Sequence, residues 1–253
     1  MVRGMSKFRE YFKDFNEQYI FIGGAACDLL MNSAGLDFRA TKDLDMVLIL
    51  EALTKEFGLR FWDFIKDAGY ELKEKSSGEL QFYRFSKPKD KEYPYMIELF
   101  SKKPNMMEIP EDVRLMPIHI DDECSSLSAI LLNDDYYSTM LSGRIVIEDI
   151  PALKTEYIIL FKAKAYLDLS ERKRNGEMID SKNIKKHKND VFRLLTLLTG
   201  DERVIVNRKV YEDIAAFAAA MEQETIDMKA LGLTEMTKEE ALEMLMNIYR
   251  DSI

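Results

Sequence analysis

The hydrophobic and polar positions change their period near Pro151, and this change divides the chain into two parts. Before Pro151, short apolar runs alternate with helix-like segments, which is typical of a β-sheet covered by helices. Beyond it the alternation disappears and the pattern looks helical to the end of the chain. We therefore predict an α+β protein, with a mixed β-sheet flanked by helices over residues 1–150 and an α-helical domain over residues 151–253.

The same patterns locate the individual elements. Phe8, Tyr11, Phe12 and Phe15 have helical spacing, so residues 6–17 are predicted to form a helix whose aromatic stripe belongs to the core. Further helices are predicted at residues 25–31, 53–68, 153–169, 181–198 and 211–223, and a last one opens at a Thr237–Glu240 capping box. Strands are predicted at residues 19–22, 46–50, 70–75, 80–86, 95–101, 127–132 and 144–147, with polar loops at 105–125 and 170–182.

A glycine pair ends the first predicted strand. The apolar run from Tyr19 to Ile22 meets Gly23 and Gly24, whose missing side chains permit a tight turn and the close approach of a ligand to the backbone. The helix that follows offers its first free amide groups and the positive end of its dipole at the same place. The stretch therefore suits the binding of a phosphate.

Two acidic residues open the next strand. Side chains alternate across a strand, so Asp43 and Asp45 point the same way while Leu44 points into the core. Two neighbouring carboxylates repel each other unless a cation lies between them, and hard oxygen ligands of this kind suit Mg²⁺. A metal-binding pair beside a phosphate-binding turn indicates nucleotide chemistry.

Glu98 is an acidic residue placed between apolar neighbours in the strand at residues 95–101. An unpaired carboxylate in a buried strand costs free energy, and a bound cation would explain its position. Two interpretations stay open. Either Glu98 completes a metal site with Asp43 and Asp45, or it faces solvent on a half-exposed strand.

Charge and composition narrow the class of protein. The net charge of −9 argues against a broad nucleic-acid-binding surface, but residues 162–193 hold ten Lys and Arg against five Asp and Glu, which suits a polyanion or a nucleoside triphosphate. Two cysteines and two histidines suggest neither a disulfide framework nor a His-based metal site. No apolar run approaches the roughly 20 residues that span a membrane, and the charged N-terminus is unlike a secretory signal, so we expect a cytoplasmic protein.

The glycine pair and the acidic strand together carry a resemblance to a known family. Gly23-Gly24, followed by the sequence RATKDLD at residues 39–45, resembles the signature of the DNA polymerase β-like nucleotidyltransferase superfamily. Within it the chain is most similar to the AbiEii/AbiGii-type nucleotidyltransferases, which include toxins of toxin–antitoxin systems. The resemblance implies a nucleotidyltransferase fold, an NTP substrate and two Mg²⁺ ions held by Asp43, Asp45 and Glu98.

The resemblance also implies a set of nucleotide-binding residues: Gly23, Gly24, Arg39, Thr41, Lys162, Lys164 and Asp190. Lys162 and Lys164 lie about 200° apart around their helix, so only one can face a common site, and Lys162 matches the family better. A solvated surface lysine is the alternative at this position. For Asp190, which follows a run of basic residues, the alternative is a plain basic helix end.

These observations predict a metal-dependent nucleotidyltransferase that moves a nucleoside monophosphate from an NTP to a hydroxyl acceptor. The resemblance implies RNA, tRNA in particular, a protein or a small molecule as the acceptor, and for a toxin a separate antitoxin protein as partner. The alternative from another class is a non-catalytic nucleotide-binding or scaffold protein that keeps the fold. No membrane partner is expected.

Overall fold

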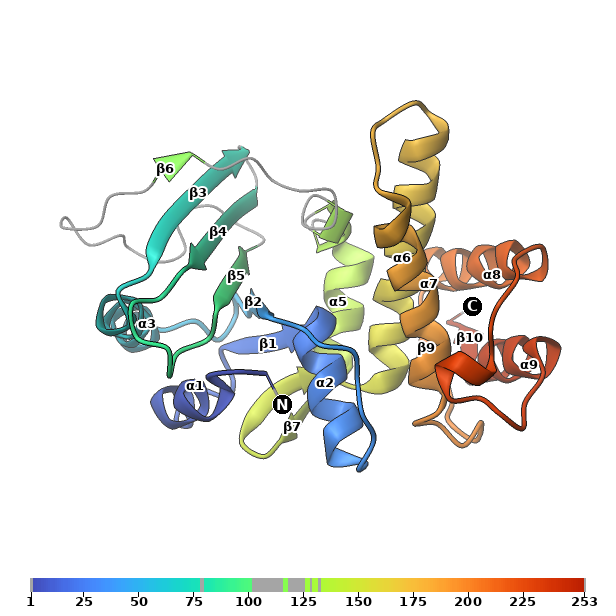
Figure 1. Ribbon diagram of the computed structural model, residues 1–253, viewed down its shortest axis with the longest axis horizontal. Helices are drawn as coiled ribbons and strands as arrows, with labels where there is room; N and C mark the ends of the chain where they lie inside the picture. The colour runs from blue at the N-terminus through green and yellow to red at the C-terminus, as the bar shows by residue number, and fades with distance from the viewer. Residues whose placement is uncertain are drawn as a thin grey trace. The chain divides into compact units, whose positions relative to one another are not determined.

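The computed structural model in Figure 1 describes residues 2–77, 80–101, 116–117, 126–127, 129–131 and 133–252, with the side chains of all of these except 72–77, 80–82 and 116–117. The chain divides into two compact units. The sheet unit comprises Met1–Ile120 and Arg144–Leu153, and the helical unit comprises Asp121–Gly143 and Lys154–Ile253. The boundary predicted at residue 150 thus lies within the second stretch of the sheet unit.

The sheet unit is built on an 8-stranded sheet with the order β6-β3-β4-β5-β2-β1-β8-β7. Strand β2 runs antiparallel to β1 and parallel to β5, so the sheet is mixed, as predicted. The strands are β1 (Tyr19–Ile22), β2 (Asp43–Leu48), β3 (Glu71–Ser77), β4 (Leu80–Ser86), β5 (Met96–Ser101), β6 (Met116–Pro117), β7 (Arg144–Ile147) and β8 (Ile150–Leu153).

Aromatic side chains from two helices form the core against this sheet. Phe8 and Phe12 of α1 (Met5–Phe12) are fully buried and stack on each other with ring centroids 4.3 Å apart. Phe64 of α3 (Lys55–Ala68) meets both rings edge-on, and the ring centroid of Phe21 in β1 lies 5.1 Å from that of Phe8. Phe8 and Phe12 of the predicted aromatic stripe are therefore core, whereas Tyr11 and Phe15 are half-buried. The burial of the core rings fixes α1 and α3 on the sheet.

The ends of these helices follow from local chemistry. Thr54 caps α3 through its side chain, which accepts a hydrogen bond from the Phe57 amide, and Gly69 ends the helix in the left-handed conformation. Helix α1 ends at Phe12, earlier than predicted. Phe15 lies in the following turn and still packs on Phe57, with ring centroids 5.8 Å apart, so the aromatic spacing does not require a continuous helix.

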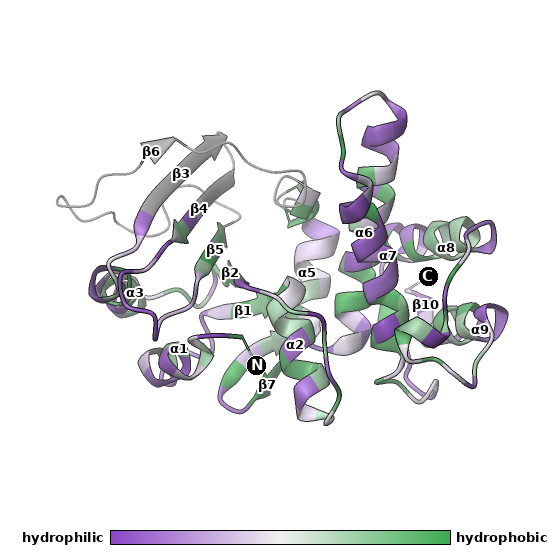
Figure 2. Cartoon of the chain, in the orientation of Figure 1, coloured by the Kyte–Doolittle hydropathy of each residue, from purple (hydrophilic) through white to green (hydrophobic). Residues whose placement is uncertain are grey.

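Helix α2 (Gly23–Ser33) connects β1 to the loop that leads into β2. The two glycines are its first residues, so the turn predicted at Gly23-Gly24 and the helix predicted from Ala25 form one element. Figure 2 shows hydrophobic residues in β1 and along much of α2, and both are buried there.

The helical unit packs α6 along α7 and α8. A capping box opens α9 as predicted, since the Thr237 and Glu240 side chains each accept from the other residue's backbone amide. None of the described helices combines the length and apolar content that crossing a membrane requires. The elements of the helical unit are α5 (Asp134–Ser142), α6 (Thr155–Arg174), α7 (Ser181–Leu195), β9 (Val204–Val206), α8 (Arg208–Glu222), η1 (Lys229–Leu231), α9 (Lys238–Ile248) and β10 (Tyr249–Asp251).

The prediction of helices only beyond Pro151 is wrong. Residues 150–153 form β8, which pairs with β1 and β7, and β9 pairs with β10 in a separate two-stranded sheet. These strands are only three or four residues long. Runs this short show too few alternations to distinguish a strand from part of a helix.

Two further predictions need correction. Described residues 126–127 and 129–131 are helical, although an apolar strand was predicted at 127–132, because a short apolar run has no diagnostic period. The loop predicted from Ser170 instead continues α6 to Arg174, where charged side chains pair along the helix, for example Arg172 with Asp168 at 3.7 Å. The loop predicted at 105–125, with His119 and Cys124, lies outside the described residues apart from 116–117.

Candidate functional site

The register of two parallel strands places three acidic residues on one face of the sheet. Asp45 of β2 pairs with Glu98 of β5, and Asp43 precedes Asp45 by two positions. Alternating side chains share a face, so all three carboxylates project from the same side. Leu44 lies between the two aspartates on the opposite face and is fully buried, as the sequence predicted.

Gly23 lies directly against Asp45. Ile22 is the partner of Asp45 across the β1–β2 pair, so the chain turns into α2 immediately beside the carboxylate. Gly23 has a φ of +63°, and a Cβ on it would lie 1.8 Å from Asp45 Oδ2. Both the backbone conformation and the space therefore require glycine at this position.

The loop before β2 folds back over the start of α2. A Cβ on Gly24 would lie 2.7 Å from Thr41 Oγ1 and 3.8 Å from an Arg39 guanidinium nitrogen. The N-cap of α2 has no side-chain hydrogen bond, and no acidic residue occupies its first turn. The structure thus brings the predicted residues Gly24, Arg39 and Thr41 together at a helix N-terminus whose amides suit an anion.

Glu98 is buried and paired with an arginine that sequence analysis did not identify. Arg84 of β4 faces Glu98 across the antiparallel β4–β5 pair, and its Nε lies 2.7 Å from Glu98 Oε1. The Glu98 residue is only 7% exposed, so the alternative of a solvent-facing carboxylate is wrong. The guanidinium of Arg84 is therefore a cation that offsets the free-energy cost of burying the Glu98 carboxylate.

A pattern in the sequence could have indicated Arg84. It is a charged residue between the aromatic residues Tyr83 and Phe85 in a predicted strand, just as Glu98 lies between the apolar residues Ile97 and Leu99 in the next one. Opposite charges in the middle of two adjacent antiparallel strands tend to be cross-strand partners. The register needed to pair them depends on the connection between the strands, which the sequence pattern does not fix.

The next question is whether the carboxylates of Asp43, Asp45 and Glu98 fit a metal ion. As the side chains lie, no three His, Cys, Asp and Glu residues among the described positions form a group that could enclose a metal. Asp43 and Asp45 nevertheless supply the carboxylate oxygens that Mg²⁺ prefers, on one face of one strand. The pair therefore fits Mg²⁺ by its chemistry, while Glu98 lies on the same face with one oxygen bound to Arg84.

Lys162 and Asp190, both predicted from the resemblance, form a buried ion pair in the helical unit. Lys162 Nζ of α6 lies 3.1 Å from Asp190 Oδ2 of α7, with side-chain exposures of 6% and 0%. Arg193 approaches the other Asp190 oxygen at 3.8 Å. The alternatives of a solvated lysine and of a plain basic helix end are therefore both wrong. A buried pair of this kind is strongly destabilised when one partner is removed.

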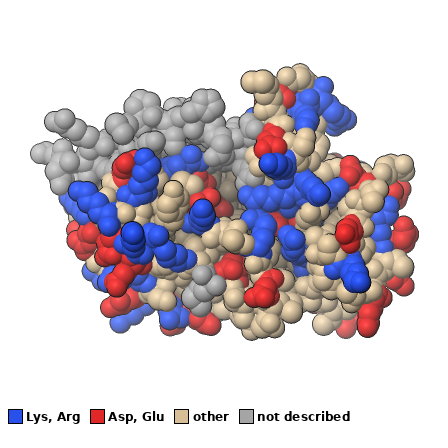
Figure 3. Space-filling view, in the orientation of Figure 1, with Lys and Arg blue, Asp and Glu red and all other residues tan. Residues whose placement is uncertain are grey.

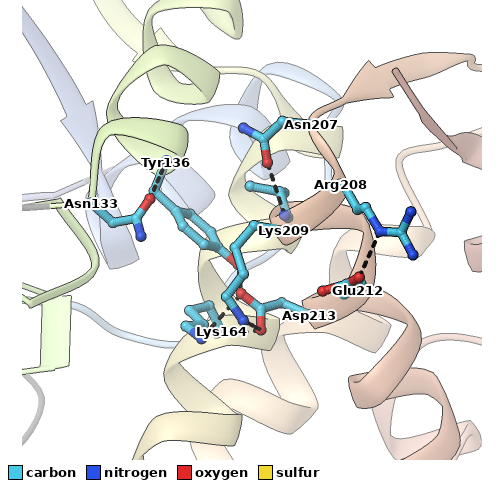
Figure 4. Close-up of polar contacts among 9 residues, drawn as sticks. Asn133, Tyr136, Lys164, Asn207, Arg208, Lys209, Glu212 and Asp213 are labelled. Carbon is cyan, nitrogen blue, oxygen red and sulfur yellow. Dashed lines mark hydrogen bonds and ion pairs between the residues drawn. The ribbon is translucent and has the colours of Figure 1, made fainter. Parts of the chain in front are cut away.

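Lys164 has a different partner, shown in Figure 4. Its Nζ lies 3.0 Å from Asp213 Oδ2 of α8, and Lys209 Nζ lies 3.1 Å from the other oxygen. The Tyr136 hydroxyl donates to the same carboxylate at 3.1 Å. Burial, and next the Asp213 carboxylate, raise the pKa of Tyr136 well above its ordinary value. Lys164 thus joins a network between α5, α6 and α8, and the two lysines face different neighbours as their helical spacing predicted.

Comparison with known proteins gives a limited result. No family model and no curated protein sequence matches the chain. Among solved structures, an antigenic nucleotidyltransferase-like protein from Paracoccidioides brasiliensis is 14% identical with a TM-score of 0.44, over 94% of this chain and 98% of that one. The Megavirus polyadenylate synthase is 11% identical with a TM-score of 0.40, over 87% of this chain and 36% of that one. Both TM-scores are below 0.5, so inference about function has to come from the residues of the site.

Proposed function

We propose that this protein is a metal-dependent nucleotidyltransferase of the DNA polymerase β-like kind. The observation that carries the proposal is the contact between Gly23 and Asp45. It joins a glycine turn at a helix N-terminus to an acidic strand whose second aspartate is in register with Glu98. A helix N-terminus that suits an anion and a pair of carboxylates this close together suit a substrate that carries both phosphates and a metal ion.

The residues at the start of α2 would bind the triphosphate. Backbone amides of the first turn would donate to phosphate oxygens, since the N-cap residue Ile22 supplies no side-chain acceptor. Arg39 and Thr41, which lie against Gly24, would add a guanidinium and a hydroxyl donor. The nucleotide would thus be oriented with its phosphates beside Asp45.

Asp43 and Asp45, with Glu98 as a third carboxylate, would hold Mg²⁺. When bound, the metal neutralises charge on the triphosphate and lowers the pKa of the acceptor hydroxyl. The acceptor oxygen then forms a bond to the α-phosphorus, the bond to the bridging oxygen breaks, and pyrophosphate leaves. Asp45 or Glu98 takes the proton of the acceptor hydroxyl, and Arg84 fixes the orientation of Glu98.

A contact between Lys162 and a phosphate stays a prediction that the family resemblance implies. Its ammonium is held by Asp190 in a buried pair, which fixes one arrangement of a long side chain. Lys164 is held by Asp213 and has a structural role in the network of Figure 4.

The acceptor classes are RNA, tRNA in particular, a protein or a small molecule. To test the activity, the protein is incubated with Mg²⁺, total cellular RNA and each α-labelled NTP in turn. Transfer of label to RNA that EDTA abolishes supports the proposal. Absence of transfer to RNA, protein and small-molecule acceptors contradicts it. A toxin role, with a separate antitoxin, predicts growth arrest on expression that Asp43→Ala removes.

A second candidate is a nucleotide-binding protein that keeps this fold without turnover. The Arg84–Glu98 pair favours it, because a guanidinium already occupies one oxygen of the third carboxylate. Such a protein binds NTP with Mg²⁺ but transfers no label to any acceptor. Equilibrium binding of NTP, measured beside the transfer assay, separates the two functions.

A further inference from the structure

The helical unit contains a cavity that the reaction proposed above does not use. It has a volume of about 750 Å³ and lies between the second half of α6, the first half of α7 and the end of α8. Its lining includes Tyr166, Lys173, Arg174, Lys185, Lys188 and Glu224. All of these residues belong to one unit, so the cavity is a feature of that unit alone.

Positive charge predominates on the cavity wall. Four cationic side chains line it against the single carboxylate of Glu224. Lys188 is buried and already occupies that carboxylate, with its Nζ 2.6 Å from Glu224 Oε2. Lys173 contacts the hydroxyl of Ser181. The wall therefore carries a clear excess of positive charge in a chain whose net charge is −9.

Among the described residues, the side chains of two of these cations have neither an anionic nor a hydroxyl partner. Within the part of the chain that the structure describes, Arg174 and Lys185 form no ion pair, and both are exposed. Arg172, on the same helix, is by contrast paired with Glu177 at 2.9 Å. Figure 3 shows Lys and Arg side chains gathered along the α6–α7 hairpin. Uncompensated cations around a hollow raise the local concentration of anions there.

We propose that this cavity binds the phosphate backbone of an RNA strand. Cations that come from two helices suit successive phosphates of a strand better than one compact triphosphate. A nucleoside triphosphate also arrives with Mg²⁺, for which carboxylates are the usual protein ligands, and the only carboxylate lining the cavity is occupied by Lys188.

Binding of RNA, measured without NTP or Mg²⁺, tests the proposal independently of catalysis. A fluorescent single-stranded RNA is titrated with the wild type, with Arg174→Ala/Lys185→Ala and with the charge-preserving Arg174→Lys/Lys185→Arg. The matched control is Lys229→Ala, an exposed lysine of the same unit that lies outside the cavity. Melting temperatures of all four proteins verify that they are folded.

The double alanine variant is expected to bind RNA roughly tenfold more weakly. The magnitude of the slope of log K against log salt concentration should fall by about 1.4, because each of the two lost phosphate contacts to a single strand contributes about 0.7. The charge-preserving variant and Lys229→Ala should bind like the wild type.

Unchanged RNA binding by the double alanine variant overturns the proposal, as does an equal loss in Lys229→Ala. Displacement of the RNA by NTP alone, at equal phosphate concentration, would show that the cavity is a nucleotide site and would also overturn the proposal. Asp45→Ala separates this inference from the proposed function, because it should bind RNA like the wild type while losing transfer. If RNA binds in the cavity but neither the wild type nor any variant transfers label, the proposed reaction fails while the RNA-binding site stands.

Discussion

Asp45 occupies the space that a side chain on Gly23 would need: an added Cβ would lie 1.8 Å from Asp45 Oδ2. The contact is made possible by the β1–β2 register, which pairs Ile22 with Asp45. It ties the start of α2 to the acidic strand.

Gly23→Ala should destabilise the protein by about 2–5 kcal/mol, because a left-handed φ costs about 1–2 kcal/mol for alanine and displacement of Asp45 adds an overpacking cost. Gly35→Ala is the matched control. Gly35 also has a positive φ, +73°, but nothing lies within 4 Å of its added Cβ, so it should lose only the backbone part. Urea unfolding measures both. Equal losses in the two variants would contradict the close contact.

Arg84→Ala should cost about 3–5 kcal/mol, since it leaves the carboxylate of Glu98 buried without its cationic partner. If Glu98 also belongs to a metal site, Mg²⁺ should restore part of this loss. The melting temperature of Arg84→Ala is therefore expected to rise with Mg²⁺ more than that of the wild type. An Arg84→Ala/Glu98→Gln variant provides the control and should show no such rise. A Mg²⁺ response that is the same in all three proteins would exclude Glu98 from metal binding.

Lys162→Ala should destabilise the helical unit by about 3–5 kcal/mol, because Asp190 is fully buried and its remaining cation, Arg193, lies at 3.8 Å. Lys164→Ala should cost about 1 kcal/mol or less. Lys164 is partly exposed, and Asp213 keeps Lys209 and the Tyr136 hydroxyl as partners. Chemical denaturation of the two variants gives the comparison. A larger loss in Lys164→Ala would show that the network of Figure 4 holds the helices together more strongly than the Lys162 pair.

Much of the sheet unit could be predicted from the sequence because its signals are local. The alternation of Asp43, Leu44 and Asp45 sets which side chains share a face, and α3 ends at Ala68, before Gly69, where the helix was predicted to end. These patterns depend on the geometry of one element and need no knowledge of its neighbours.

The parts that the sequence did not reveal depend on contacts between elements. The partner of Glu98 is Arg84 because of the register between β4 and β5, and the need for glycine at position 23 comes from the position of Asp45. Strand β8 is likewise defined by its pairing with β1 and β7, since its four residues have no diagnostic period. Register and pairing are properties of the folded sheet, so a pattern along one strand does not contain them.

The central claim is that the acidic strand beside Gly23 carries out Mg²⁺-dependent nucleotidyl transfer. The most direct test is the rate of label transfer from α-labelled NTP to RNA by the wild type, Asp45→Asn and the control Asp63→Asn, an exposed acid on α3. We expect Asp45→Asn to lose roughly 10²–10³-fold in rate while staying folded, and Asp63→Asn to match the wild type. Full Mg²⁺-dependent transfer by folded Asp45→Asn would contradict the claim.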